Sequence, residues 1–225
     1  MTALTSALAP QLTETLPPLD DQQHMVLDDV SWELYEKMLR EQQERHVRIT
    51  YDQGRMEIMS PLPEHEYPAH AIATFIVLLA MELDIPIGGL GSTTFRRKDQ
   101  KKGLEPDECF YVQNEARVRG KKRLDLRRDP PPDLAIEIDI THRTIPKMPI
   151  YLKLGVAEVW RLDEAGLRCH LLRGGKYRVA EKGRAFPMLR VKDLEPFLRR
   201  LKRDDETTVM RAFRDWVGRS FGAPS

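Results

Sequence analysis

Hydrophobic and polar residues along the chain follow two periods, and the change from one to the other outlines the predicted elements. Alternation with a period of two is typical of strands, whereas apolar residues three or four positions apart are typical of helices. The strand pattern occurs at 46–61, where a turn at Asp52 to Gly54 predicts a hairpin, and at 92–98, 103–115, 132–140, 156–163, 167–173 and 176–180. The helical pattern occurs at 31–45, 63–87, 144–155, 191–203 and 206–221.

The segment 132–163 combines a strand, a helix of about three turns and a second strand. Thr144 is the expected N-cap of the helix, and Gly155 is placed to end it. Strands joined in this way lie parallel, with a right-handed crossover between them. With the hairpins before and after it, this unit predicts an α/β fold in which a mixed central sheet is flanked by helices and extended by antiparallel hairpins.

Composition narrows the class of protein. The chain has 225 residues, of which 41% are hydrophobic and 32% are charged, with a mean hydropathy of −0.49. We expect a flexible N-terminal tail at 1–25, rich in proline, threonine and aspartate, followed by a single domain at 26–225. No apolar run approaches the roughly eighteen residues of a membrane span, and the N-terminus lacks signal-peptide features. These features predict a cytoplasmic protein with no membrane partner.

Two further counts bear on chemistry. Cys109 and Cys169 form no CxxC pair, so we expect two buried thiols and neither a zinc knuckle nor a disulfide framework. The net charge is only +1, but the segment from Arg96 to Arg128 contains twelve lysines and arginines and only six acids. Such a stretch either binds phosphates or is merely a solvated loop. The candidate nucleic-acid-binding residues in it are Arg96, Arg97, Lys121 and Lys122.

The strand at 132–140 carries acids on one face. Its period of two places Leu134, Ile136 and Ile138 on one side and Asp133, Ala135, Glu137 and Asp139 on the other. Glu137 and Asp139 are then about 6.6 Å apart, and Asp133 lies about 13 Å from Glu137. If the strand that carries Asp107 adjoins this one, Asp107 and Glu137 can converge on Mg²⁺. The alternative is an acidic face that meets solvent.

Lys147 begins the helix that follows the acidic strand, near the strand end where ligand sites of α/β sheets form. An ammonium there can orient a water for attack on a phosphodiester and offset charge on the phosphate. By itself, a lysine on a helix is more often a solvated charge.

Four segments carry a resemblance to a known family: "VRITYDQGRMEIMSPLPEHE", "GSTTFRR", "EPDECFYVQNE" and "PDLAIEIDITHRTIPKMPIYLKLGVAEVWRLD". Together they resemble the bacterial Uma-two family of restriction-endonuclease-like proteins, formerly a domain of unknown function, over about residues 30 to 215. The family is placed in the PD-(D/E)xK nuclease superfamily. The resemblance implies a restriction-endonuclease-like sheet and a phosphodiesterase site that depends on Mg²⁺ or Mn²⁺.

The resemblance also assigns residues. Asp107 matches the aspartate of the Pro-Asp motif, Glu137 the acid of the central strand and Lys147 the lysine that the family places on the following helix, so Asp107 and Glu137 are the implied metal ligands. His65 matches a recurring histidine that orients a ligand or contacts phosphate, although it is equally a helix cap.

One departure concerns the lysine of the superfamily motif. Two residues beyond Glu137, where that motif has lysine, this chain has Asp139. Asp139 is then a third ligand, or it marks a site that is repurposed or weakened. A further acid from an early helix is common in the superfamily, and the candidates, which the sequence does not rank, are Glu64, Glu66 and Glu82.

These features predict Mg²⁺-dependent hydrolysis of DNA phosphodiester bonds, with Asp107, Glu137 and Lys147 as catalytic residues and Asp139, His65 and Glu66 as accessory ones. The alternative is a catalytically silent module that keeps the fold and binds nucleic acid or another protein. A homodimer formed through the hairpin at 175–179 is a further expectation.

Overall fold

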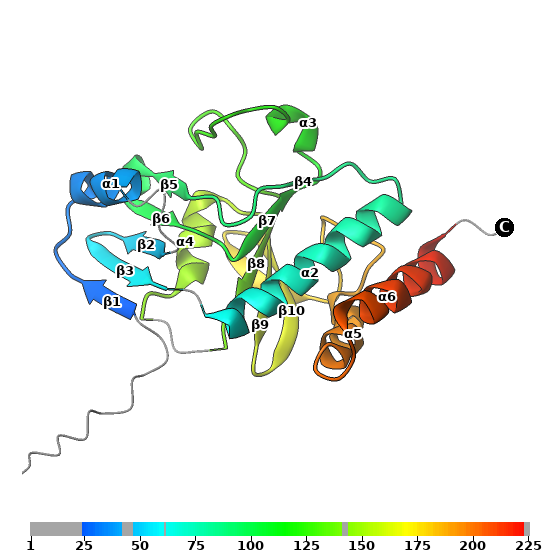
Figure 1. Cartoon of the computed structure of the whole chain (residues 1–225). Coiled ribbons are helices and arrows are strands. Elements are labelled where there is room, and N and C mark those ends of the chain that lie inside the picture. The colour runs from blue at the N-terminus through cyan, green and yellow to red at the C-terminus, as the bar shows by residue number, and fades with distance from the viewer. Residues whose placement is uncertain (1–23, 42–46, 61, 141–143, 223–225) are drawn as a thin grey trace, which may run out of the picture.

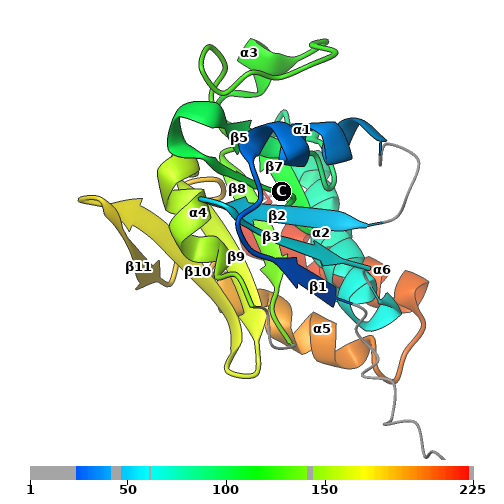
Figure 2. The ribbon, with the colours of Figure 1, turned by 90° about the vertical axis from the view of Figure 1, so that its left-hand side faces the viewer.

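The computed structural model describes residues 24–41, 47–60, 62–140 and 144–222. Its elements are stacked in layers in which two sheets alternate with helices (Figures 1 and 2). Helix α1 (Trp32–Glu41) covers the outer face of the first sheet, and α4 (Lys147–Leu154) lies between the two sheets. The outer face of the second sheet is covered by α2 (Pro63–Glu82), α5 (Glu195–Arg200) and α6 (Glu206–Phe221). The predicted α/β class is confirmed.

The first sheet is antiparallel, with the order β1-β3-β2-β6-β5. Its strands are β1 (His24–Leu27), β2 (Arg48–Asp52), β3 (Arg55–Met59), β5 (Phe95–Arg97) and β6 (Lys102–Leu104). The predicted hairpin at Asp52 to Gly54 joins β2 to β3, and Gln53 and Gly54 both have positive φ as the turn requires. Strand β1 was not predicted, because four residues without turn signals give too little pattern.

The second sheet is mixed, with the order β11-β10-β9-β8-β7-β4. Its strands are β4 (Gly88–Gly89), β7 (Glu108–Tyr111), β8 (Leu134–Ile138), β9 (Glu158–Asp163), β10 (Gly166–Arg173) and β11 (Lys176–Ala180). Strands β8 and β9 are parallel and the other pairs are antiparallel. The predicted strand–helix–strand unit is therefore confirmed.

Helix α4 begins later than predicted. Pro146, not Thr144, occupies its N-cap position, and no side chain caps the helix. The backbone N–H of Thr144 instead donates to Glu57 Oε1 of β3 at 2.9 Å, so tertiary contact directs the approach to the helix. Gly155 ends α4 with a φ of 82°, a left-handed conformation that glycine adopts without strain.

The single strand predicted at 103–115 is wrong. The segment divides into β6 and β7, which belong to different sheets, and Glu105, Pro106 and Asp107 connect them. Pro106 has no backbone N–H to give to a ladder, so the run of strand formers is interrupted there. As a result, Asp107 lies at the junction of the two sheets.

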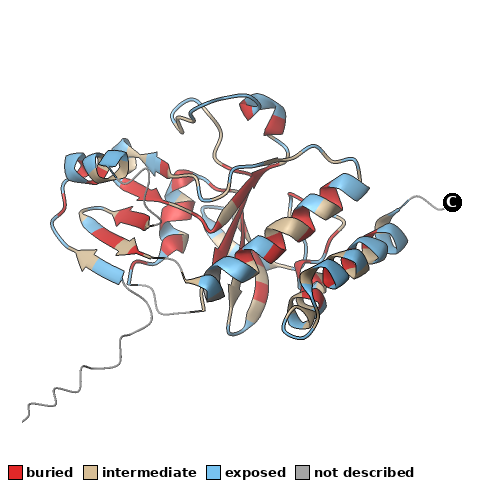
Figure 3. Cartoon of the chain, in the orientation of Figure 1, coloured by how far each residue is buried: buried red, intermediate tan, exposed pale blue. Residues whose placement is uncertain are grey.

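Both faces of β8 are buried in the core (Figure 3). Leu134, Ile136 and Ile138 pack toward α2 and α6, while Ala135 packs toward α4. Cys109 and Cys169 are buried free thiols, as predicted. None of the helices in the described part of the chain is long and apolar enough to span a membrane.

Candidate functional site

Asp107, in the connection between β6 and β7, lies against the backbone of β8 next to Glu137. Asp107 Oδ2 accepts a hydrogen bond from the backbone N–H of Ile138 at 2.5 Å, and the backbone N–H of Asp107 donates to Ile136 O at 3.2 Å. Asp107 is therefore held against the backbone on both sides of Glu137. The two residues are only 3% and 2% exposed, so an acidic face that meets solvent is excluded at this point of the strand.

Lys147 and Tyr151 of α4 contact Glu137 from the layer between the sheets. Lys147 Nζ is 2.6 Å from Glu137 Oε1, and the Tyr151 hydroxyl donates to Oε2 at 2.6 Å. Because the two residues are four positions apart on a helix, they share one face. Lys147 Nζ also donates to the backbone oxygen of Glu105 at 3.0 Å. Lys147 is buried, so it is not a solvated helix charge.

Arg48 of β2 brings a second cation to the carboxylates. Its guanidinium forms an ion pair with Asp107, and both side chains are buried. A second contact, 2.6 Å long, joins Arg48 to Glu66 at the start of α2, where the carboxylate is half-exposed. Arg48 therefore ties together the first sheet, the second sheet and α2.

These contacts explain how two acids remain in so apolar a place. Burial of an ionised carboxylate costs roughly several kcal/mol, because the carboxylate loses its contacts with water. An ion pair with a buried cation offsets this cost. Arg48 is the partner of Asp107, and Lys147 is the partner of Glu137. Breaking either pair leaves the other charge buried without its counterion. The arrangement thus depends on all four side chains together.

Asp139 points to a different partner. Its carboxylate lies 2.5 Å from the Arg161 guanidinium on β9 and is partly exposed. Asp139 nevertheless lines the same cavity as Glu137 and Lys147. This cavity has a volume of about 530 Å³, and Arg161, Asp163 and Glu164 also line it. The site therefore opens to a space large enough for a phosphate group and water.

Two more acids lie near these residues. Glu57 of β3 is buried and accepts the hydrogen bond from Thr144 described above. Glu105 accepts a hydrogen bond from Thr94 Oγ1 at 2.7 Å. Burial raises the pKa of Glu105, while that hydrogen bond and the charges of Lys147 and Arg48 act in the opposite direction.

The remaining predicted accessory residues separate into two groups. The side chains of Glu64 and His65 lie outside the described residues. Glu66 forms an ion pair with Arg48, which also pairs with Asp107, while Glu82, at the far end of α2, lies 3.9 Å from Arg214 of α6. Glu82 is therefore not a further ligand of this site.

Sequence reasoning missed Arg48, Tyr151 and Glu57. A signal existed for Tyr151, because it follows Lys147 by one helical turn. Arg48 and Glu57 fall on the polar face of a hairpin, where charges usually meet water. Their burial follows from the second sheet and α4, which no local pattern reveals.

The basic residues predicted to bind nucleic acid fall mostly in one place. Arg96, Arg97 and Lys122 line a cavity of about 830 Å³ beside α1 and β5. Lys121 forms an ion pair with Asp129 instead.

Comparison with known families supplies the deciding observation. Residues 32–204 match the model of the Uma2 family, whose description is "Putative restriction endonuclease". The chain belongs to the Uma2 family. This confirms the resemblance noted in the sequence, and the family description implies a nuclease whose substrate is DNA. Asp107, Glu137 and Lys147 all fall inside the matched range.

Solved structures include a similar protein from Anabaena variabilis ATCC 29413, described as "a putative nuclease belonging to DUF820". The two chains are 16% identical with a TM-score of 0.41, and the alignment covers 58% of this chain and 75% of that one. A search of curated proteins finds no match.

Proposed function

We propose that this Uma2 protein is a metal-dependent endonuclease that hydrolyses DNA phosphodiester bonds at Asp107, Glu137 and Lys147. The observation that carries the proposal is the buried contact of 2.6 Å between Lys147 and Glu137, which both line a cavity, while Asp107 accepts the backbone N–H of Ile138 next to Glu137. Two acids and a lysine are the groups that metal-assisted phosphodiester hydrolysis uses. A cytoplasmic location, expected from the sequence, would place the enzyme with DNA.

The donor chemistry fits a hard divalent cation. Mg²⁺ is commonly held by one or two carboxylates, with waters and substrate phosphates completing the shell. Asp107 and Glu137 would supply those carboxylates, and Mn²⁺ accepts the same ligands. The described residues contain no cluster of three or more His, Cys, Asp or Glu side chains suited to a metal, so the proposed site has two carboxylates and relies on substrate oxygens. Such a cation polarises the phosphate and lowers the pKa of a bound water.

The protein side chains would perform the remaining work. Lys147, held between Glu137 and Glu105, would orient the attacking water or stabilise the negative charge on the five-coordinate phosphorus. The water oxygen forms a bond to phosphorus and gives up one proton, one ester P–O bond breaks, and the leaving oxygen takes up a proton, so that one water is added across the ester bond. Tyr151 would fix the Glu137 rotamer, and Arg48 would neutralise Asp107 when no metal is bound.

A plasmid assay tests the proposal. Supercoiled DNA is incubated with the protein and Mg²⁺ or Mn²⁺, beside Glu137→Gln, a chelator control and the matched variant Glu164→Gln, which changes another acid that lines the cavity. We expect nicked or linear DNA from the wild type and Glu164→Gln alone. Equal cleavage by Glu137→Gln would reject Glu137 as a catalytic residue.

A second candidate function is favoured by one observation. Arg48 and Lys147 already neutralise the two carboxylates, so the site is stable without a metal. This suits a module that keeps the fold and binds DNA or a protein without cutting. Such a module would retard DNA in a gel in the presence of a chelator and leave it intact under every metal condition.

The proposed dimer has a surface that can be tested. Strand β11 ends the second sheet, and an edge strand presents backbone groups that a second copy can pair with. Sedimentation of the wild type and of Val179→Pro, which removes a donor from this strand, would show whether pairing depends on it.

A further inference from the structure

A cavity of about 830 Å³ lies outside the carboxylate site. One wall is formed by α1 together with β5 and η1 (Lys98–Gln100), and the facing wall is the loop 122–127. Phe95, Leu124 and Leu126 are buried or half-buried there and belong to the cluster around α4, so the floor is anchored in the core. The cavity is therefore a groove between two fixed walls.

Cations dominate both walls. The first wall contributes Arg40, Arg96, Arg97 and Lys98, and the loop contributes Lys122, Arg123 and Arg127. The acids lining the groove are Glu36 and Asp125. Four of these seven cations have acidic partners, since Arg96 pairs with Glu36, Arg97 with Asp99, Lys98 with Glu33 and Arg127 with Asp125. These pairs are at least partly exposed, so each is weak. Seven cations against these four acids leave an excess of three positive charges, which attracts polyanions.

The groove is connected to the carboxylate site by hydrogen bonds. Thr94, which lines the groove, donates to the side chain of Glu105 at 2.7 Å. The backbone oxygen of the same Glu105 accepts a hydrogen bond from Lys147 Nζ at 3.0 Å. Glu105 therefore links the wall of the groove to the lysine of the site through its side chain and its backbone.

We propose that this groove binds the sugar-phosphate backbone of DNA and guides it toward Glu137 and Lys147. The inference rests on the proposed function for its substrate, but it concerns binding and not cleavage. An extended polyanion fits best, because cations on two facing walls can contact several successive phosphates. A single small anion would engage only one of these positions.

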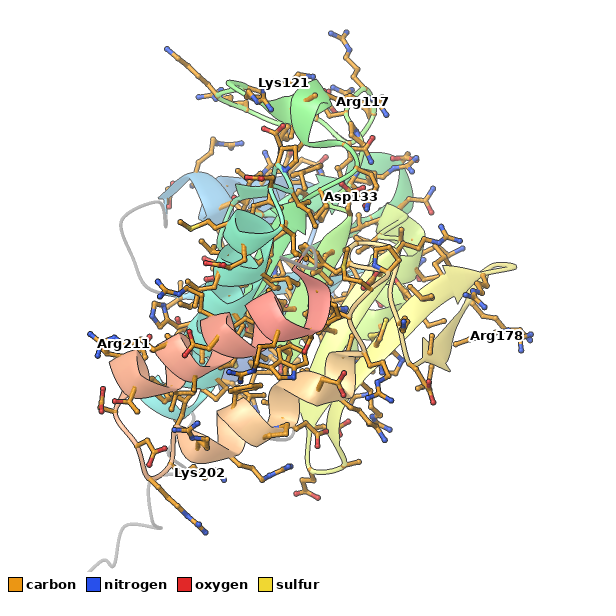
Figure 4. The ribbon with its side chains drawn as sticks, turned by 90° about the vertical axis from the view of Figure 1, so that its right-hand side faces the viewer. Arg117, Lys121, Asp133, Arg178, Lys202 and Arg211 are labelled. Carbon is orange, nitrogen blue, oxygen red and sulfur yellow. The ribbon has the colours of Figure 1, made fainter. Side chains whose placement is uncertain are left out.

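The test compares two triple variants. The groove variant changes Arg96, Lys122 and Arg123 to glutamine, all of which are exposed. The control changes Lys202, Arg211 and Arg214 to glutamine; these exposed residues lie after α5 and on α6, and Lys202 and Arg211 are away from Lys121 in Figure 4. Both variants lose three positive charges, so net charge cannot distinguish them. Circular dichroism and thermal melting establish that both remain folded.

Binding is measured by fluorescence anisotropy with a labelled 30-base-pair duplex, in a chelator, over a range of salt concentrations. We expect the groove variant to bind at least about tenfold more weakly at low salt and to lose about 2–3 from the slope of log K against log salt concentration. The control should retain the slope of the wild type. Equal losses in both variants, or none in the groove variant, would overturn the inference.

The result is separable from the proposed function. If the wild type binds DNA through the groove and never cuts it, the endonuclease proposal is wrong and the proposal that the groove binds DNA is supported. If the groove variant cuts and binds DNA like the wild type, the proposal that the groove binds DNA is wrong, while the catalytic proposal is unaffected.

Discussion

Lys147 Nζ lies 2.6 Å from Glu137 Oε1, with both side chains almost completely buried. The two residues are ten positions apart and belong to different elements, β8 and α4. Because the contact lies between two sheets, it serves the packing of the fold as well as the proposed chemistry. Its energetic and catalytic roles can be measured separately.

The first prediction concerns the coupling of this pair. Lys147→Met or Glu137→Gln alone should lower the free energy of unfolding by about 3–5 kcal/mol, since each leaves its partner buried without full compensation. The double variant should be more stable than the sum of the single losses predicts. Urea unfolding of the four proteins gives the coupling.

The exposed pair Lys37 and Glu41 on α1 supplies the matched control for that cycle. Its atoms are 3.9 Å apart and both side chains are mostly exposed. Its coupling should be about 0.5 kcal/mol or less. Additivity in the buried cycle would contradict the prediction.

The second prediction concerns Arg48 and metal affinity. The Arg48 guanidinium competes with a cation for Asp107, so Arg48→Met should bind Mn²⁺ roughly tenfold more tightly without DNA, a change of about 1.4 kcal/mol. Mn²⁺ should then raise the melting temperature of Arg48→Met more than that of the wild type. Calorimetry gives the affinity.

Arg55→Met is the control for Arg48. Arg55 lies on the neighbouring strand and pairs with the exposed Asp28 at 2.9 Å. It should leave Mn²⁺ binding unchanged. Weaker binding by Arg48→Met would mean that the arginine supports the metal site and does not compete with it.

The third prediction is a dependence of stability on pH at Glu105. Burial raises the pKa of this carboxyl above 4.5, so the folded state binds its proton more tightly than the unfolded state does. Its contribution to stability is fully present below pH 4.5 and is lost as pH rises through the higher folded value. Glu105→Gln should therefore gain stability over the wild type as pH rises to 7.

Denaturant unfolding at about pH 4 and pH 7 measures that change. The same substitution at the exposed Glu41 provides the reference. If the difference in unfolding free energy between Glu105→Gln and the wild type were the same at both pH values, the pKa of Glu105 would not be raised on folding.

The fourth prediction concerns Gly103 on β6. The Tyr35 ring stacks on Tyr51 at 4.7 Å between ring centres, and a methyl group on Gly103 would overlap the Tyr35 hydroxyl. Gly103→Ala should lose about 1–3 kcal/mol of stability, and Tyr35→Phe should recover part of it by removing the hydroxyl.

Gly218→Ala is the counterpart of that experiment, because open space surrounds Gly218 on α6. An alanine there should add about 0.5–1 kcal/mol of stability through helix propensity. Thermal melting of both variants measures the contrast. Comparable losses at the two glycines would show that close packing is not the cause.

Local patterns predicted the elements whose hydrophobic period is complete. The expected helix at 206–221 is α6, and the hairpin around Gly54 and the parallel pair β8 and β9 are present. The errors fall where tertiary contacts outweigh local preference. Glu57 accepts the Thr144 N–H that a helix cap would have oriented, and Pro106 divides a run of strand-forming residues between two sheets.

The sequence by itself determined that Glu137 and Ala135 face one side of β8 and Leu134, Ile136 and Ile138 the other, because side chains alternate along a strand. Only the tertiary structure decided that this acidic side is buried and that Arg48 and Lys147 are its counterions. Alternation is set by the local backbone geometry. The cost of burying a carboxylate depends on which charges, distant in the sequence, the packed sheets bring close to it. A short segment of sequence does not reveal the order of the strands.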